Sequence, residues 1–477
     1  MNAPLRGDGR IRIERLAWRS SQDPGGALFF CAPHRGQTET EVARKASASG
    51  ARAIVASRWL PLRIPQIRVP SIHTYMGRIA SEFYDRPSDK LVVAAVTGTN
   101  GKTTVTYLLE SIFKAAGLTP GVVGNTGVWL DGELLHPPSA QRSFQSPLLH
   151  RRLHELREGG ALAVAMEAWA YALEQHRLNG LHVACAIFTN FTRDHLRHFG
   201  TMHRYLRAKA KLFTPQYTDR IVLNADAPES FLFVRSDLPV LTYGIARPAD
   251  LNATEVQTTA QGVSFRVGDL RLRSPLLGLF NVENCLAAAA GARCLGLEDD
   301  VIAEGLETVR PVPGRLQPIQ VGQEFRVFVD YAHTPDGLDK MLDAVRPLTP
   351  GRILLVTCCG GDRDRGKRPM MAEIATAKAD LTVMTTTSPG SEDPLDIIAD
   401  WEAGAAAGRY VVEVDRRSAI AMALGKATHG DTVVIAGHGH ETEQNWGDHT
   451  VPFDDRVVAT EELARLTGAV RDGGTHG

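Results

Sequence analysis

The chain has no run of about 18 apolar residues, the length that a membrane-spanning helix needs. Residues 1–10 are polar and carry no apolar segment of the kind found in secretory signal peptides. We therefore expect a cytoplasmic protein that does not cross a membrane.

Net charge is almost absent as well. The 53 Lys and Arg residues balance 54 Asp and Glu residues, which leaves a formal charge of −1. Without a global positive field the chain is poorly suited to hold nucleic acid or an anionic membrane. We expect small-molecule partners and a monomer.

Cysteine is scarce and shows no CxxC spacing. Its positions lie mostly within apolar runs: Cys31, Cys185, Cys285, Cys294, Cys358 and Cys359. These residues are interpreted as small core side chains in a reducing compartment.

Three domains are expected from 477 residues at roughly 150 residues per domain. Short β-branched runs alternate with stretches of helical period, which predicts an α/β fold with largely parallel sheets. A polar linker at 81–90 and the hinge Pro311–Gly314 divide the chain into 1–88, 89–310 and 311–477.

The second domain opens with a phosphate-binding pattern. The strand 91–96 is followed by a glycine loop and a helix from Val105, and the loop reads Gly98-Thr99-Asn100-Gly101-Lys102-Thr103-Thr104. Glycines expose backbone N–H groups to phosphate oxygens at a helix N-terminus. Lys102 would balance phosphate charge, and the Thr103 hydroxyl would reach Mg²⁺. The alternative is a chance match at a helix start.

A carboxylate, a histidine and a lysine follow this loop in the sequence. Glu167 ends the apolar strand 161–166, at the edge where open α/β sheets bind ligands. Together with His195 it would suit a cation beside a triphosphate. Lys209 lies further on, in the stretch 208–213. Taken singly, each has another interpretation: a solvated strand end, a surface pair with His198, or an exposed helical face with Lys211.

Longer motifs in the third domain make the pattern specific. They are Val312-Pro313-Gly314-Arg315, Asp330-Tyr331-Ala332-His333-Thr334-Pro335, Gly360-Gly361-Asp362-Arg363, Ser391-Glu392-Asp393-Pro394 and Gly437-His438-Gly439-His440-Glu441, preceded by Asn281-Val282-Glu283-Asn284. As a set, with the phosphate loop, they resemble the Mur ligase family. Within it they are most similar to the ligases that add the third amino acid to UDP-N-acetylmuramoyl-dipeptide in peptidoglycan synthesis.

The resemblance implies an N-terminal acyl-substrate domain, a central ATPase domain and a Rossmann-like C-terminal domain that binds an amino acid. It implies that ATP and Mg²⁺ are used to make an acyl phosphate, which the amino group then attacks. By residue, it implies catalytic roles for Lys102, Glu167, His195 and Lys209. It implies metal binding by Thr103, Glu167, His195 and a carbamylated Lys209. Nucleotide contacts are implied for Asn281, Asn284, Arg315, Asp330 and His333, and substrate contacts for Arg177, Arg363, Ser388, Gly437 and Glu441.

Both substrate pockets depart from the family pattern. The family commonly has Asp-Asn-Pro-Arg before Glu392, and its arginine grips the distal carboxylate of diaminopimelate. Here the stretch is Thr387-Ser388-Pro389-Gly390. Without that arginine, we expect an amino acid other than diaminopimelate.

On the acyl side, the family's Thr-Thr-Pro-Glu becomes Arg142-Ser143-Phe144-Gln145, and its Glu-Val-Ser-Ser-His becomes Glu167-Ala168-Trp169-Ala170-Tyr171. The uridine signature Asp-Ser-Arg is represented only by Arg19-Ser20-Ser21, and the Asp-Gly-His element is missing around Gly36-Gln37-Thr38. Lost hydroxyls remove hydrogen-bond partners for a polar sugar-peptide. Two hypotheses therefore stand: a cell-wall ligase, or a ligase of specialised metabolism that uses another carboxylate.

Three other interpretations remain. A cyanophycin- or polyglutamate-type ligase would share the phosphate loop. An ATP-gated binding module would need that loop but not the amino-acid contacts. His438, His440 and Glu441 could form a zinc site, although they lack the His-x-x-x-His spacing of metallohydrolases.

Overall fold

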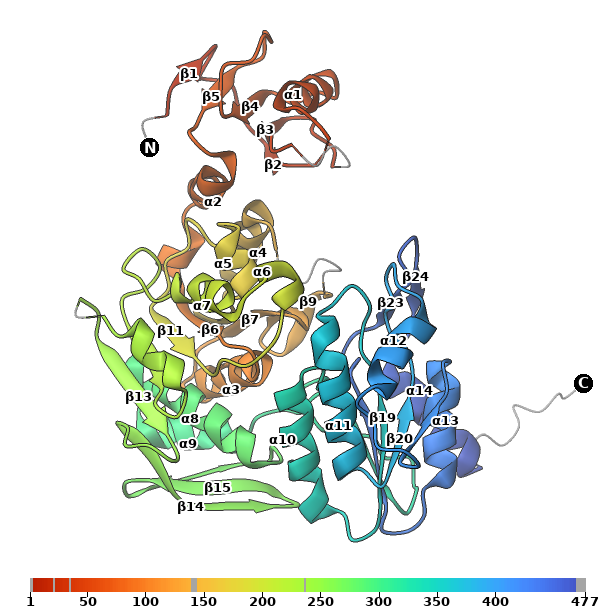
Figure 1. The fold of residues 1–477 in the computed structure, drawn as a ribbon. Helices are drawn as coiled ribbons and strands as arrows, with labels where there is room; N and C mark the ends of the chain where they lie inside the picture. The colour runs from red at the N-terminus through yellow and green to blue at the C-terminus, as the bar shows by residue number, and fades with distance from the viewer. Residues whose placement is uncertain (1–2, 20–21, 34–35, 139–143, 236, 469–477) are drawn as a thin grey trace, which may run out of the picture.

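The computed structural model describes residues 3–19, 22–33, 36–138, 144–235 and 237–468. Helix-flanked β-sheets follow one another along the chain, so the predicted α/β class is confirmed. In Figure 1 the first sheet lies at the top, the second below it and the third to the right. We call residues 89–310 the central region and 311–477 the C-terminal region; these boundaries stay a prediction.

The first sheet has the order β1-β5-β4-β3-β2 and is parallel except for β1. Its elements are β1 Leu5–Arg6, β2 Arg15–Ala17, β3 Ala27–Phe30, α1 Glu39–Ala48, β4 Ala53–Ala56, β5 Gln66–Arg68 and α2 Ile72–Phe83. A capping box starts α1, because Thr38 and Glu41 bond each other's backbone N–H. The predicted linker begins too early: α2 continues to Phe83, and Pro87–Lys90 forms a 3₁₀ turn (η1).

The central sheet has the order β16-β15-β14-β13-β12-β11-β6-β10-β7-β8-β9. Its middle is parallel, and antiparallel strands extend both edges. The strands are β6 Val92–Thr97, β7 Pro120–Gly124, β8 Gly127–Leu130, β9 Glu133–His136, β10 Ala163–Glu167, β11 Cys185–Phe188, β12 Ile221–Asn224, β13 Val240–Gly244, β14 Leu251–Thr259, β15 Gly262–Val267 and β16 Leu270–Ser274.

The helices of the central region are α3 Lys102–Ala115, α4 Ser146–Glu158, α5 Ala170–Glu174, α6 Leu196–Phe199, α7 Met202–Ala210, α8 Leu279–Cys294 and α9 Asp299–Glu307, with a 3₁₀ turn η2 at Pro228–Phe233. Apolar residues cover both faces of the parallel strands, as buried parallel sheets require. The predicted core cysteines are free thiols; all are buried except Cys294, which is partly exposed.

The C-terminal sheet has the order β17-β18-β22-β19-β20-β21 and is parallel from β18 onward. Its strands are β17 Gln317–Pro318, β18 Arg326–Asp330, β19 Ile353–Thr357, β20 Leu381–Met384, β21 Tyr410–Val412 and β22 Thr432–Ala436, and β23 Glu443–Asn445 pairs with β24 Thr450–Pro452. The helices are α10 Pro335–Val345, α11 Arg368–Lys378, α12 Pro394–Glu402, α13 Arg416–Lys426 and α14 Asp455–Leu466, with 3₁₀ turns η3 Arg346–Leu348 and η4 Arg365–Lys367.

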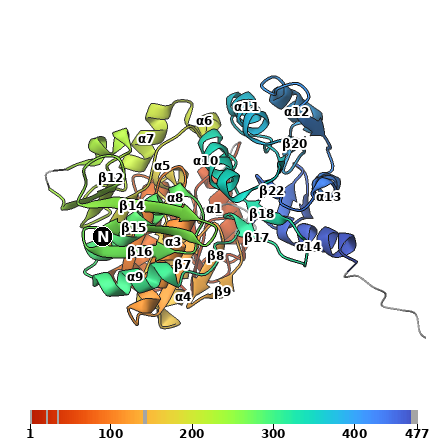
Figure 2. The same ribbon diagram turned by 90° about the horizontal axis from the view of Figure 1, so that it is seen from below.

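Both views place α10 between α8 of the central region and the C-terminal sheet (Figures 1 and 2). The carboxyl ends of β6, β10 and β18 carry the residues predicted to bind nucleotide and metal. Within the described ranges, no helix has the length and apolar character needed to cross a membrane.

Candidate active site

The phosphate loop is built by two glycines with positive φ. Gly98 has φ 157° and Gly101 has φ 86°. A Cβ at Gly98 would collide with the Thr189 hydroxyl, and one at Gly101 with the Asn284 side chain. Gly101 starts α3 without a side-chain cap, so the N–H groups of the first turn remain available to an anion.

Lys102 folds back over this loop. Its Nζ donates to the carbonyl oxygens of Gly98, at 3.0 Å, and Thr99, at 2.8 Å. Burial lowers the pKa of Lys102, against the attraction of Glu167 and Asp194. The ammonium therefore lies at the loop where phosphate charge would accumulate.

Glu167 is fully buried, so the interpretation as a solvated strand end is wrong. One carboxylate oxygen, Oε1, accepts from the Thr103 hydroxyl at 2.9 Å and from Asn125 N–H at 3.0 Å. The other, Oε2, is buried with no partner among the described residues. An orphaned buried carboxylate oxygen beside a phosphate loop fits a bound cation.

Lys209, near the end of α7, is also buried, which excludes the exposed-face interpretation. Its Nζ donates to the Gly98 carbonyl at 2.6 Å and lies 4.4 Å from the centre of the Tyr205 ring. Burial lowers the pKa of Lys209 well below its usual value, and the charge of Lys102 lowers it further. A neutral amine is the form that can react with CO₂ to give a carbamate.

His195 stands in the left-handed region, φ 57°, immediately before α6. Its ring lies 5.7 Å from the centre of Tyr205, so His195 and Lys209 flank the same ring. Its side chain is 46% exposed, and its Nε2 lies 3.3 Å from Asp194.

The C-terminal region faces the loop from the other side. Arg315 donates to the Thr103 hydroxyl at 3.2 Å and stacks over Tyr331 at 4.7 Å. Asp330 accepts the N–H groups of Leu316 and Ala332 at the end of β18, and burial raises its pKa against the nearby Arg315.

The remaining predicted nucleotide contacts lie close by. His333 bonds the Tyr331 carbonyl at 2.8 Å and lies 3.7 Å from Asp194. Asn284 donates to Asn281 at 2.8 Å beside Gly101. The structure thus gathers these predicted residues around the loop.

The predicted amino-acid contacts lie at the carboxyl ends of the C-terminal strands. Glu441 accepts from the Tyr331 hydroxyl at 2.8 Å, and Gly437, with φ 101°, faces the Cys358 sulfur. Ser388 accepts from the Asn445 N–H at 3.1 Å, and Arg363 lies in the loop after β19. Gly390 has φ 61°, and a Cβ there would collide with the Asp362 carboxylate.

Aromatic groups surround the predicted acyl contact. The Arg177 guanidinium lies 4.8 Å from the centre of the Tyr171 ring, which in turn lies 4.4 Å from His198. Trp169 meets Phe144 edge to face at 6.4 Å, and its buried indole N–H has no partner among the described residues. Of the departures noted above, Ser20, Ser21, Arg142 and Ser143 lie outside the described residues.

Two site residues were missed from the sequence. Asn125, in the turn after β7, donates to Glu167, and its own side-chain oxygen is buried without a partner in the described chain. Lys367 is buried, 3.5 Å from Asp194, and donates to the His333 carbonyl at 2.8 Å. The sequence offered little signal for them, because their partners lie 34 or more positions away.

Metal binding by protein side chains alone is not supported. Among the described residues, no group of three or more His, Cys, Asp or Glu side chains could hold an ion. Both ring nitrogens of His438 are engaged, by the Thr387 hydroxyl and the Phe453 carbonyl, so the zinc interpretation is wrong. Mg²⁺ takes few protein ligands and completes its shell with phosphate and water, which fits Glu167, Thr103 and His195.

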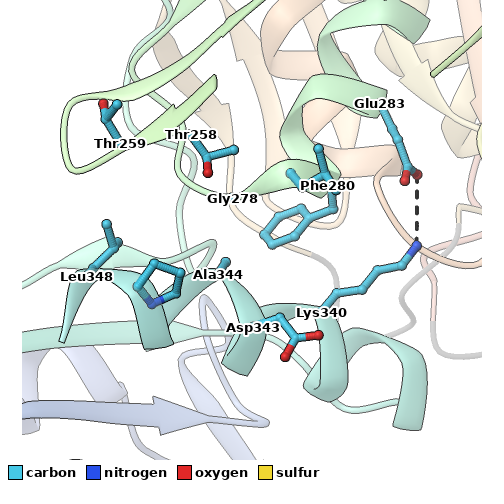
Figure 3. Close-up of a pocket in the computed structure, with 11 residues that line it drawn as sticks. Thr258, Thr259, Gly278, Phe280, Glu283, Lys340, Asp343, Ala344 and Leu348 are labelled. Atoms are coloured by element: carbon cyan, nitrogen blue, oxygen red, sulfur yellow. Dashed lines mark ion pairs between the residues drawn. The ribbon is translucent and has the colours of Figure 1, made fainter. Parts of the chain in front are cut away.

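A separate cavity of about 260 Å³ lies between α8, α10 and the β14–β15 hairpin (Figure 3). Glu283 and Lys340, 3.9 Å apart, form its polar side. None of the predicted site residues lines this cavity.

The chain is similar to known proteins over most of its length. The Mur ligase middle domain matches residues 96–292, and the Mur ligase glutamate ligase domain matches 314–439. A relative from Geobacillus thermodenitrificans, named UDP-N-acetylmuramoyl-L-alanyl-D-glutamate–2,6-diaminopimelate ligase, is 41% identical over 94% of this chain and 95% of its own. A relative of the same name from Gloeobacter violaceus is 40% identical over 95% of this chain and 94% of its own. A solved structure titled with that name is 32% identical with a TM-score of 0.66, covering 95% of each chain.

Proposed function

Because the chain belongs to the Mur ligase family and is an ATP-dependent, amide-bond-forming ligase, we propose that it joins UDP-N-acetylmuramoyl-dipeptide to an amino acid other than diaminopimelate. The observation that carries the proposal is the meeting of two regions at the phosphate loop: Glu167, Lys209 and Thr103 on one side, and Arg315 on the other. Relatives of that name, 36% to 41% identical, support the acyl substrate and disfavour a polyglutamate- or cyanophycin-type reaction.

A carboxylate is a poor electrophile, so the γ-phosphoryl group is first transferred to it. In this step Lys102 and the N–H groups of the first turn of α3 stabilise charge on the transferring phosphoryl group. Mg²⁺, when bound, would supply further charge neutralisation, held by Glu167, Thr103, His195 and the carbamate of Lys209.

The unprotonated amino group then attacks the acyl carbon, and the bond to phosphate breaks with its electron pair leaving on phosphate. The nitrogen loses one proton to solvent as the amide forms. The planar guanidinium of Arg363 suits the α-carboxylate of the incoming amino acid. Glu441, fixed by the Tyr331 hydroxyl, would contact its far end. Gly390 supplies no cation there, which is why diaminopimelate with its distal carboxylate is disfavoured.

A second candidate is a ligase of specialised metabolism that uses a carboxylate unrelated to the cell wall. The specific observation in its favour is the aromatic lining formed by Trp169, Phe144 and Tyr171 beside Arg177. Small hydroxyl groups stand at the corresponding family positions, and rings there offer fewer hydrogen bonds to a sugar-peptide.

Phosphate release with UDP-N-acetylmuramoyl-dipeptide and each amino acid in turn, with mass spectrometry of the products, tests the proposal. Turnover with one amino acid other than diaminopimelate is the expected result. Turnover with diaminopimelate alone would contradict the amino-acid part. No turnover in protein that still binds ATP would contradict the acyl part and favour the second candidate.

A further inference from the structure

The segment 189–200, which follows β11, is bonded closely to the phosphate loop. Thr189 donates to the Asn100 carbonyl at 2.6 Å, and Asn190 accepts the Asn100 N–H at 2.9 Å. The Thr192 N–H donates to the Thr99 hydroxyl at 3.0 Å. The first half of this segment therefore moves with the loop that would hold the phosphates.

The second half of the same segment holds the C-terminal region. Arg193 makes a two-bond contact with Asp364, with distances of 2.8 and 3.1 Å, and Arg197 donates to Asp362 at 2.7 Å. These two aspartates flank Arg363, the residue expected to grip the amino acid. Two arginines of the central region thus fix the loop on each side of Arg363.

A buried ion pair lies between these contacts. Asp194 and Lys367 are 6% and 3% exposed, and their charged atoms are 3.5 Å apart. This pair also joins the central region to the C-terminal region.

We propose that Arg193 and Arg197 are positioning residues that couple amino-acid binding at Arg363 to the phosphate site. This inference rests on the proposed ligase reaction. The segment 189–200 carries His195 and contacts both the phosphate loop and the loop around Arg363. We call the Arg193–Asp364 and Arg197–Asp362 contacts the clamp. The amine is aligned with the acyl phosphate only when the clamp is formed. Without it, water attacks the acyl carbon instead and releases phosphate and the original carboxylate.

The test is a double-mutant cycle on Arg193→Gln and Asp364→Asn. Asparagine keeps the oxygen that caps Gly366 N–H, so η4 is preserved while the charge is lost. We expect each single variant to raise the KM for the amino acid by roughly three- to tenfold, as for loss of a partly exposed ion pair. The KM for ATP should change less than about twofold, and less amide should form per phosphate released.

In the double variant we expect no further loss, because the first change already removes the contact. Arg207→Gln, an exposed residue on α7, is the matched control and should behave as the wild type. Additive losses, or equal rises in the KM for ATP and for the amino acid, would overturn the inference.

A substrate-independent readout separates this inference from the proposed function. Small-angle scattering of wild type and variants with ADP and Mg²⁺ reports how closely the two regions approach. We expect a larger radius of gyration for Arg193→Gln than for wild type or Arg207→Gln, even if the wild type turns over no tested substrate pair. Equal radii would overturn the clamp while leaving the ligase assignment intact.

Discussion

The Thr103 hydroxyl donates to one carboxylate oxygen of Glu167 across 2.9 Å and leaves the other oxygen buried without a partner in the described chain. The two residues come from α3 and from β10, whose last residue is in register with Val96 of β6. A helix start and a neighbouring strand end thus converge on one point, which is the geometry that a phosphate-bound cation needs.

Glu167→Gln should abolish the response to Mg²⁺ and lower the rate of phosphate release on the order of a hundredfold or more, as loss of a group that stabilises the transition state does. Its melting temperature should not fall, because glutamine removes a buried charge that has one oxygen without a partner in the described chain. Glu110→Gln is the control: it breaks a bidentate pair with Arg310 and should cost stability but keep the Mg²⁺ response. Calorimetric titration of ADP with and without Mg²⁺ measures the difference, and an unchanged Mg²⁺ response in Glu167→Gln would refute the role.

Lys209→Gln should lose phosphate release while remaining folded, because a buried amine is replaced by a neutral side chain of similar size. Lys211→Gln, two positions away and bonded to the Leu173 and Glu174 carbonyls, should retain activity. Wild-type protein in bicarbonate should carry a CO₂ adduct on Lys209 detectable by ¹³C NMR. Equal activity of the two variants, or no adduct, would count against the carbamate.

Arg363→Ala should raise the apparent KM for the amino acid far more than the KM for ATP, because the guanidinium is expected to contact the amino acid and not ATP. Steady-state kinetics with each substrate varied in turn gives both values. Equal increases would show that Arg363 has a different role.

Gly390→Arg restores the family's arginine but should not create a diaminopimelate ligase. The left-handed φ of 61° and the adjacent Asp362 carboxylate oppose any side chain there, at a cost of about 1–2 kcal/mol in stability. Gly390→Ala carries the same backbone cost without the charge and is the matched control. Turnover of diaminopimelate by Gly390→Arg alone would contradict this expectation.

His150 should make the protein less stable in mild acid. Burial lowers the pKa of His150 to about 4 from an ordinary value of 6.5. The Nδ1 atom of its ring has no hydrogen-bond partner in the described chain. Between pH 6.5 and pH 4 the unfolded state therefore binds more protons than the folded state. The stability that neutral His150 allows is fully present above pH 6.5 and is lost as the pH falls toward 4. At pH 5 the loss amounts to roughly 2 kcal/mol.

Urea denaturation at pH 7.5 and pH 5 measures this loss. His150→Gln should show a smaller decrease between the two pH values than wild type, whereas exposed His429→Gln should match wild type. An identical decrease in His150→Gln would exclude His150 as the cause.

The local elements were largely predictable. Strand–glycine–helix chemistry at 92–115 depends on neighbouring residues, and the predicted strands 91–96 and 161–166 are observed within two residues of the expected bounds. The end of α2 was not predictable. The polar run after Ser81 has the composition of a linker, but Ser81 is buried and α2 continues to Phe83. Burial of Glu167 and Lys209 was equally hidden, because exposure depends on what packs above a residue.

By itself the sequence determined the α/β class, the phosphate loop, the family resemblance and the loss of the arginine at Gly390, because each depends on residue identity and short-range order. Only the tertiary structure decided that Asn125 and Lys367 join the site, that Arg193 and Arg197 hold the loop around Arg363, and that Gly390 abuts Asp362. These contacts join residues 28 to 171 positions apart, and sheet order and domain packing, not local propensity, bring such residues together.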